Sequence, residues 1–276
     1  MSDASIVGNL RKMRAEKGDP ILYTLPVGAG AVALNPLLGK KIGIRHTGNI
    51  HCVACGRATA KSFNQGHCFP CFRRLASCDG CIVRPERCHY HLGTCREPGW
   101  GEANCMRPHV VYLANSSGVK VGITRETQVP TRWIDQGATQ ALPIARVASR
   151  RLSGLVEVAF KEHVSDRTDW RRMLKGEPES VDLNASRDAL FARCGESLTG
   201  LADAHEHVDP EFIVDAESLV FRYPVLEYPV KVTAINLDKN PQAEGTLLGI
   251  KGQYLIFDTG VLNVRKYGGY EIELRA

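Results

Sequence analysis

Two apolar patterns of different period stand side by side in the middle of the chain. Residues 109–124, HVVYLANSSGVKVGIT, form two β-prone runs around a polar turn, which predicts a hairpin. In residues 151–166, apolar side chains recur at spacings of three and four, which predicts a helix with one buried face. That stripe consists of Leu152, Leu155, Val156, Ala159, Phe160 and Val164. With a helix near PTRWIDQGA and a strand at LPIARVAS between them, the pattern predicts an α/β unit.

The flanking segments predict a mixed architecture. Residues 1–20 resemble a loosely held polar helix, and the following thirty alternate apolar runs with Gly and Pro, as strands do. A further helix is expected at 183–206, and the β-rich tail from Phe212 suits a small antiparallel barrel or curled sheet. We therefore expect an α+β fold. The expected divisions are 1–50, 51–108, 109–182 and 183–276.

Composition limits the class of protein. The 276 residues are 43% hydrophobic and 24% charged, which is ordinary for a globular protein. No apolar run reaches the length of a membrane span, and residues 1–20 show no secretory signal, so we expect a cytoplasmic protein without membrane contact. Ten cysteines in a reducing compartment favour metal thiolates over disulfides.

The net charge of +5 is unevenly distributed. Residues 45–175 contain twenty Lys or Arg against ten Asp or Glu, whereas residues 176–276 contain nine against seventeen. The basic part is therefore the candidate for contact with a nucleic-acid backbone, either DNA or RNA. The acidic C-terminal part is the candidate for a protein partner.

The first cysteine set has the spacing of a zinc ribbon. Cys52, Cys55, Cys68 and Cys71 form two Cys-x-x-Cys pairs that are twelve residues apart. Each pair places two sulfurs on one turn, and two such turns complete a tetrahedron around Zn²⁺. Because a four-sulfur site leaves no open position for water, we expect a structural rather than a catalytic ion.

A second cysteine set follows within a few residues. Cys78, Cys81, Cys88 and Cys95 are the predicted ligands of a second Zn²⁺. His89, His91 or Cys105 could replace either of the last two. The two histidines could equally pack or form hydrogen bonds nearby, and Cys105 could be a buried free thiol.

The hairpin carries residues that resemble those of the GIY-YIG nuclease domain. Val110-Val111-Tyr112 stands where that family has Gly-Ile-Tyr, and Lys120-Val121-Gly122 stands where it has Tyr-Ile-Gly. Thr124 matches a threonine two positions later, Arg132 matches the arginine of the first helix, and Glu157 matches the metal-binding glutamate of a later helix. The resemblance covers residues 109–175. The whole chain also resembles an uncharacterised bacterial family, which implies no activity.

The resemblance implies roles in phosphodiester cleavage. Tyr112 would activate water, Arg132 would bind phosphate, and Glu157 would hold Mg²⁺ or Mn²⁺. Gly122, Thr124 and Arg125 would contact the substrate. Lys120 replaces the second tyrosine of the motif, and a lysine accepts a proton near neutral pH only if burial lowers its pKa.

Each of these residues also has a structural interpretation. Tyr112 could be a partly buried strand residue, and Trp133 a core residue. Arg132 could pair with Asp135, and Glu157 with Lys161 one helical turn away. The sequence therefore leaves two functions open. One is a nucleic-acid-binding protein, with or without cleavage, and the other is a non-catalytic zinc adaptor or regulator.

Overall fold

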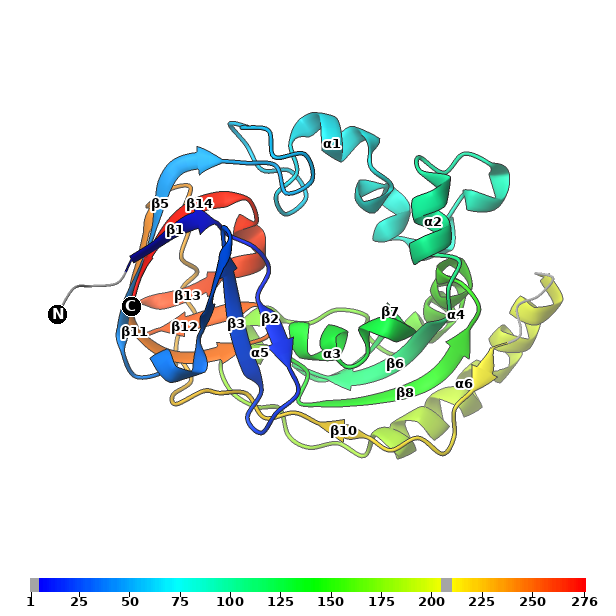
Figure 1. The fold of residues 1–276 in the computed structure, drawn as a ribbon. Helices are drawn as coiled ribbons and strands as arrows, with labels where there is room; N and C mark the ends of the chain where they lie inside the picture. The colour runs from blue at the N-terminus through cyan, green and yellow to red at the C-terminus, as the bar shows by residue number, and fades with distance from the viewer. Residues whose placement is uncertain (1–4, 205–209) are drawn as a thin grey trace.

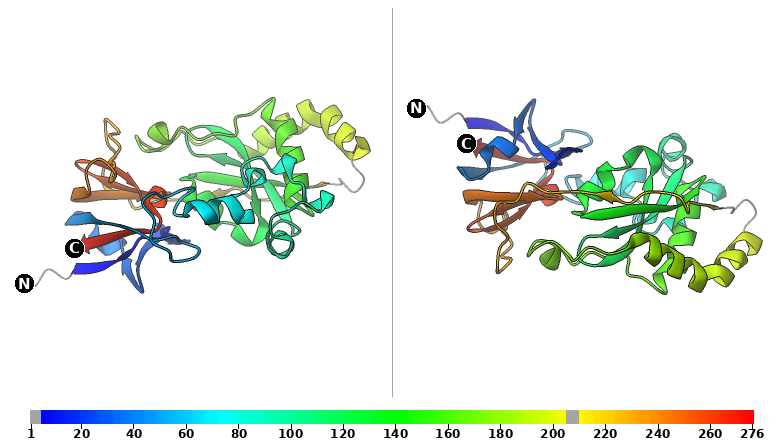
Figure 2. Two further views of the ribbon diagram at one scale, coloured as in Figure 1. Left: turned by 90° about the horizontal axis from the view of Figure 1, so that it is seen from above. Right: turned by 90° about the horizontal axis from the view of Figure 1, so that it is seen from below.

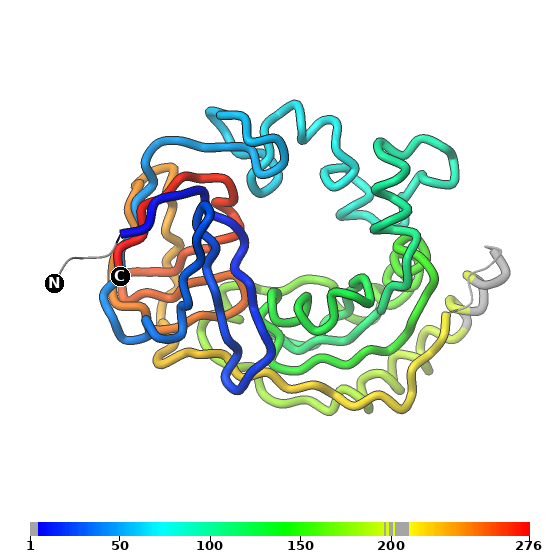
Figure 3. The backbone as a smooth tube through the Cα atoms, viewed as in Figure 1, coloured from blue at the N-terminus to red at the C-terminus, as the bar shows by residue number. Residues whose placement is uncertain are grey.

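The computed structural model describes residues 5–204 and 210–276. Their backbone follows a ring, in which a β-rich part and an α/β part are bridged on one side by the cysteine-rich segment (Figures 1 and 3). The strands are β1 Ser5–Asn9, β2 Arg14–Glu16, β3 Leu22–Val27, β4 Gly30–Ala33, β5 Lys41–Ile50, β6 His109–Asn115, β7 Val119–Arg125, β8 Gln140–Val147, β9 Glu211–Phe212, β10 Leu219–Val220, β11 Gln242–Lys251, β12 Tyr254–Phe257, β13 Gly260–Asn263 and β14 Tyr270–Arg275. The α-helices are α1 Phe69–Arg74, α2 Pro98–Asn104, α3 Thr131–Asp135, α4 Arg150–Lys161, α5 Trp170–Met173 and α6 Leu183–Ala204. The fold is α+β, as predicted.

The two ends of the chain share one sheet. Its strand order is β1-β14-β5-β11-β12-β13, and Ser5 of β1 pairs with Arg275 of β14. The sequence-based division placed these strands in separate segments, whereas the pairing joins them in one part of the molecule (Figure 2). Strands β2, β3 and β4 form a separate sheet of three.

Of the barrel or curled sheet expected for the C-terminal tail, the barrel does not form. None of the sheets in the described residues closes, and the outer side of β13 is bridged by Ala234 rather than by β1. The helix expected within residues 1–20 is absent from the described part of that stretch, which forms β1 and β2. Pairing with β14 and burial of Leu10 and Met13 outweigh the polar local pattern.

The α/β part confirms the predicted hairpin. Strands β6 and β7 pair in antiparallel register with Tyr112 opposite Gly122, and β8 pairs with the other side of β6. Strand β6 is buried along its whole length, and its side chains alternate between two cores. Val110, Tyr112 and Ala114 face the core shared with the terminal sheet, and Val111 and Leu113 face α4 and α6.

Helix α4 also forms as the apolar stripe predicts, with Val156 and Phe160 fully buried. The Ser149 side chain caps its first turn by accepting a hydrogen bond from the amide of Leu152. Gly154 allows the cysteine-rich segment to dock on this helix, since a Cβ there would lie 2.5 Å from the backbone nitrogen of Glu86.

The cysteine-rich segment contains little regular structure. Apart from α1 and α2 it consists of turns and single-turn 3₁₀ helices, among them Ala76–Cys78, Gly80–Ile82, Pro85–Arg87 and Tyr90–Leu92. In the described part of the chain, no helix has both the length and the apolar character needed to cross a membrane.

Candidate functional site

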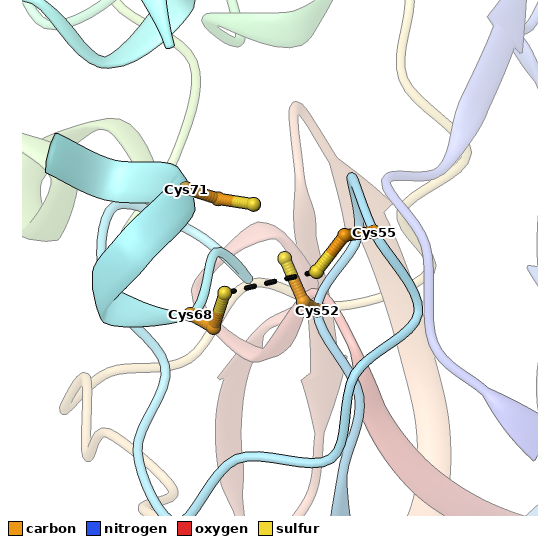
Figure 4. A group of neighbouring side chains, drawn as sticks. All are labelled: Cys52, Cys55, Cys68 and Cys71. Atoms are coloured by element: carbon orange, nitrogen blue, oxygen red, sulfur yellow. Dashed lines mark hydrogen bonds between the residues drawn. The ribbon is translucent and has the colours of Figure 1, made fainter. Parts of the chain in front are cut away.

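The first cysteine set forms a compact group. Cys52 and Cys55 come from the turn after β5, and Cys68 and Cys71 lie at the start of α1 (Figure 4). All four sulfurs lie within 4.8 Å of one another, and the Sγ atoms of Cys55 and Cys68 are 3.8 Å apart. That distance matches the edge of a tetrahedron around an ion with bonds of about 2.3 Å, so the group can bind zinc.

The surroundings of Cys52 favour its thiolate. Burial raises the pKa of this thiol, but amide hydrogen bonds from Cys68, Cys55 and Ala54 outweigh burial and lower the pKa to about 6. A zinc ligand must be deprotonated. Backbone amides directed at a sulfur are therefore the arrangement that a structural thiolate site requires.

The second cysteine set lies on the turns between α1 and α2. Cys78, Cys81, Cys88 and Cys95 do not form a compact four-sulfur group like the first one. Cys81 instead lies close to Asp79 and His89. Asp79 is already paired with Arg96 at 2.6 Å, and this positive charge opposes binding of a cation at the same carboxylate.

A basic hollow lies where the cysteine-rich segment faces the α/β part. It has a volume of ≈ 550 Å³, and its wall combines residues of the cysteine-rich turns, β7, α3, α4 and the turn before β14. Its charged residues are Arg125, Arg132, Arg150 and Arg265, and no aspartate or glutamate lines it. We call this cavity the arginine hollow.

The four arginines keep their charges available. None of them forms an ion pair with a carboxylate of the described residues. Two are held in place by neutral acceptors instead. Arg150 donates to the carbonyl of Ile82 at 2.6 Å, and Arg265 donates to the side chain of Gln65 at 2.6 Å. Positioned guanidinium groups without a counter-charge are suited to binding an anion.

A second hollow adjoins the first. It has a volume of ≈ 600 Å³ and shares Gln65 and Arg265 with the arginine hollow. Its other charged residues are Arg11, Lys12 and Arg14, of which Lys12 forms an ion pair with Asp135. Positive charge therefore continues from the α/β part to the N-terminal strands.

Tyr112 lies inside the protein. Its side chain is fully buried, and its hydroxyl donates a hydrogen bond to the side chain of Gln136 at 3.1 Å. Burial raises the pKa of this phenol, and the charge of Arg132 opposes the rise. The space in front of Gly122 is occupied by the Tyr112 ring, because a Cβ at position 122 would lie 2.8 Å from the phenol oxygen.

Lys120 and Glu157 are buried beside the hollow rather than lining it. Burial lowers the pKa of Lys120 to about 8, with Arg132 acting in the same direction and Glu157 against it. Burial raises the pKa of Glu157, and this carboxylate is paired with Lys161 at 3.5 Å, the pairing expected from helical spacing.

The structure thus separates the predicted site residues into two groups. Thr124, Arg125 and Arg132 line the arginine hollow. Tyr112, Lys120 and Glu157 form a buried polar group next to it, in which the charge of Glu157 also raises the pKa of Tyr112.

Sequence reasoning missed two of the four arginines. Arg150 is one of several arginines at the start of a helix, and Arg265 lies in the part of the chain that is acidic on balance. Only the tertiary fold brings them to Arg132, so no local signal could have identified them.

Comparison with known proteins gives a family. The model of the family described as "Protein of unknown function (DUF2797)" matches residues 39–272. Neither the curated proteins nor the solved structures contain a match. The matched range includes both cysteine sets and all four arginines of the hollow.

Proposed function

We propose that this chain, which belongs to the DUF2797 family, binds the phosphate backbone of a nucleic acid in the arginine hollow. The observation that carries the proposal is the convergence of four arginines, without carboxylate partners among the described residues, on one cavity that no acidic residue lines. Guanidinium groups bind phosphate through paired hydrogen bonds, and such contacts supply most of the affinity that does not depend on base sequence.

The dimensions of the basic surface support a polymeric anion. The arginine hollow and its neighbour share Gln65 and Arg265, so positive charge continues beyond the reach of a single phosphate group. The zinc-type group at Cys52–Cys71 fits this proposal as a structural element, because Asn64, Gln65 and His67, which lie between its two cysteine pairs, form part of the wall.

Binding is tested with fluorescently labelled single-stranded and duplex oligonucleotides of DNA and RNA. We expect measurable affinity at low salt that Arg125→Ala/Arg132→Ala weakens. The matched control is Lys231→Ala/Lys239→Ala, which removes the same charge from exposed positions outside the hollow. Equal losses in the two double variants, or no binding of any oligonucleotide, would contradict the proposal. The second result would favour a zinc adaptor whose acidic C-terminal part contacts a protein.

Metal-dependent phosphodiester hydrolysis is a second candidate function. It is favoured by one observation, the lowered pKa of Lys120, which gives a lysine in place of the second motif tyrosine the capacity to accept a proton near pH 8. On the GIY-YIG resemblance, Arg132 would bind the phosphate and Glu157 would hold Mg²⁺ or Mn²⁺. Burial of Tyr112 and the pairing of Glu157 with Lys161 weigh against it.

Cleavage is tested separately from binding. Single-stranded, duplex and branched substrates are incubated with Mg²⁺ or Mn²⁺, and Glu157→Gln and Lys120→Met are compared with the parent chain. If hydrolysis occurs at this site, both variants lose cleavage but retain binding. Binding without cleavage in the parent chain would remove this second function and leave the first intact.

A further inference from the structure

The arginine hollow is bounded on two sides by walls that are joined to each other. Turns of the cysteine-rich segment line one side, and β7, α3 and α4 line the other (Figure 1). Arg150 of α4 donates to the carbonyl of Ile82 in the opposite wall at 2.6 Å. Arg265, in the turn before β14, donates to Gln65 of the cysteine-rich segment, also at 2.6 Å. These hydrogen bonds oppose any widening of the hollow.

The size of the hollow suits one nucleotide at a time. Its volume is ≈ 550 Å³. Cavities of about 300–1,000 Å³ enclose molecules of drug size, which is also the size of a nucleotide. A duplex carries its phosphates on a wide convex surface, so it can touch the rim of such a hollow but cannot enter it.

Side-chain amides stand among the arginines. Asn64, Gln65 and Gln128 line the hollow, and all three are exposed. In the described part of the chain, the amides of Asn64 and Gln128 have no hydrogen-bond partner, and Gln65 uses only its oxygen, which accepts from Arg265. A phosphate group needs donors alone, whereas an amide offers a donor and an acceptor together. That pair of groups matches the edge of a base, adenine above all.

The backbone holds two of these amides in an unusual conformation. Asn64 has φ of 41° and Gln65 has φ of 63°, in the left-handed region that residues with side chains rarely adopt. Both lie in a tight turn that mutual backbone hydrogen bonds of Phe63 and His67 close at 2.8 Å. Glycine would adopt this conformation without strain. Strained residues of this kind occur preferentially where a side chain serves a ligand, and here both side chains line the hollow.

We propose that the arginine hollow receives a single-stranded nucleic acid and that Asn64, Gln65 and Gln128 form hydrogen bonds with its bases. This inference rests on the proposed binding of a nucleic-acid backbone in the same hollow. Only an unpaired strand can turn its base edges toward amides inside a hollow, because reading a duplex requires a protein element that enters a groove of the nucleic acid. The arginines then bind the backbone, and the amides distinguish the bases.

The first test compares strands by fluorescence anisotropy at one salt concentration. A labelled single strand of DNA or RNA should bind at least about tenfold more tightly than the same sequence within a duplex, and an adenine-rich strand about tenfold more tightly than a cytosine-rich one. Equal or tighter binding of the duplex would overturn the inference. If Arg125→Ala/Arg132→Ala still weakened that binding, the proposed function would stand without it. No binding of any oligonucleotide would instead refute the proposed function itself.

The second test removes amides without removing charge. Asn64→Gly/Gln128→Ala should abolish the preference for adenine and leave the affinity for the cytosine-rich strand within about twofold, because no arginine is lost. Glycine retains the left-handed turn at position 64, so the fold of this wall is kept. The matched control is Asn240→Gly/Gln242→Ala, which removes exposed amides outside the hollow and should keep the full preference. An undiminished preference in Asn64→Gly/Gln128→Ala, or the same loss in the control, would refute recognition of bases by these amides.

Discussion

The arginine hollow and the buried polar group beside it both contain cationic side chains, but they place them in different surroundings. In the hollow, Arg125 and Arg132 are accessible and have no carboxylate partner in the described residues. In the buried group, Lys120, Glu157 and Tyr112 are enclosed, and Glu157 is paired with Lys161. The first arrangement is available to a ligand, whereas in the second Tyr112 and Glu157 already have partners within the protein. The comparison therefore supports binding more strongly than cleavage.

The largest effect is expected from removing the zinc-type group, which should impair the arginine hollow but leave the buried polar group folded. Structural zinc contributes on the order of 10 kcal/mol to folding in small zinc domains, and here it would fix one wall of the hollow. Cys68→Ser should therefore abolish oligonucleotide binding, while the circular-dichroism signal of the α/β part is largely retained. The control is Cys194→Ser, a buried thiol on α6 away from both cysteine sets. Full binding by Cys68→Ser would show that the cysteine-rich wall is dispensable.

The next largest effect is expected at Arg265. This side chain lines both hollows, so Arg265→Ala should lower affinity about tenfold, the usual size for a lost charged hydrogen bond. Fluorescence anisotropy with a labelled oligonucleotide measures it, with Lys239→Ala as the matched control. An unchanged dissociation constant would mean that the second hollow does not extend the site.

Substitution of Gly122 tests whether the Tyr112 ring packs against this position inside the buried polar group. A Cβ at this position would lie 2.8 Å from the Tyr112 ring, so Gly122→Ala should lower the free energy of unfolding by about 1–3 kcal/mol. Urea denaturation measures the loss, and Gly99→Ala, whose new methyl group meets nothing within 4 Å, is the control. In a Tyr112→Leu background the same substitution should cost less, because the two side chains are in contact. An equal cost in both backgrounds would contradict this packing.

The burial of Lys120 predicts a smaller effect that depends on pH. Its folded pKa of about 8 lies below the ordinary value of 10.5, so the folded chain releases this proton before the unfolded chain does. The free energy of unfolding should therefore rise with pH between about 8 and 10.5, by about 1 kcal/mol per unit, and stay level in this respect below 8. Lys120→Met should lose this rise relative to the parent chain. Lys251, whose pKa burial also lowers to about 8, contributes equally to both proteins and cancels in the difference. Identical pH profiles would show that Lys120 is solvated.

The local sequence pattern was sufficient to predict those elements whose structure depends mainly on their own residues. The hairpin at Tyr112–Gly122 and helix α4 follow from apolar periodicity, and the first four cysteines follow from their paired spacing. The helix expected in residues 1–20 was wrong at Ser5–Asn9 because the partner of this strand is β14 at the other end of the chain, which no local window contains.

The salt dependence of binding tests the central claim most directly. If the arginine hollow binds the nucleic-acid backbone, the logarithm of the association constant should fall linearly with the logarithm of the salt concentration. The variant Arg125→Ala/Arg132→Ala should reduce the magnitude of this slope by about two, one for each lost phosphate contact. Lys231→Ala/Lys239→Ala should leave the steepness unchanged. A parent chain whose affinity does not vary with salt, or a hollow variant with the full parental steepness, would contradict the account.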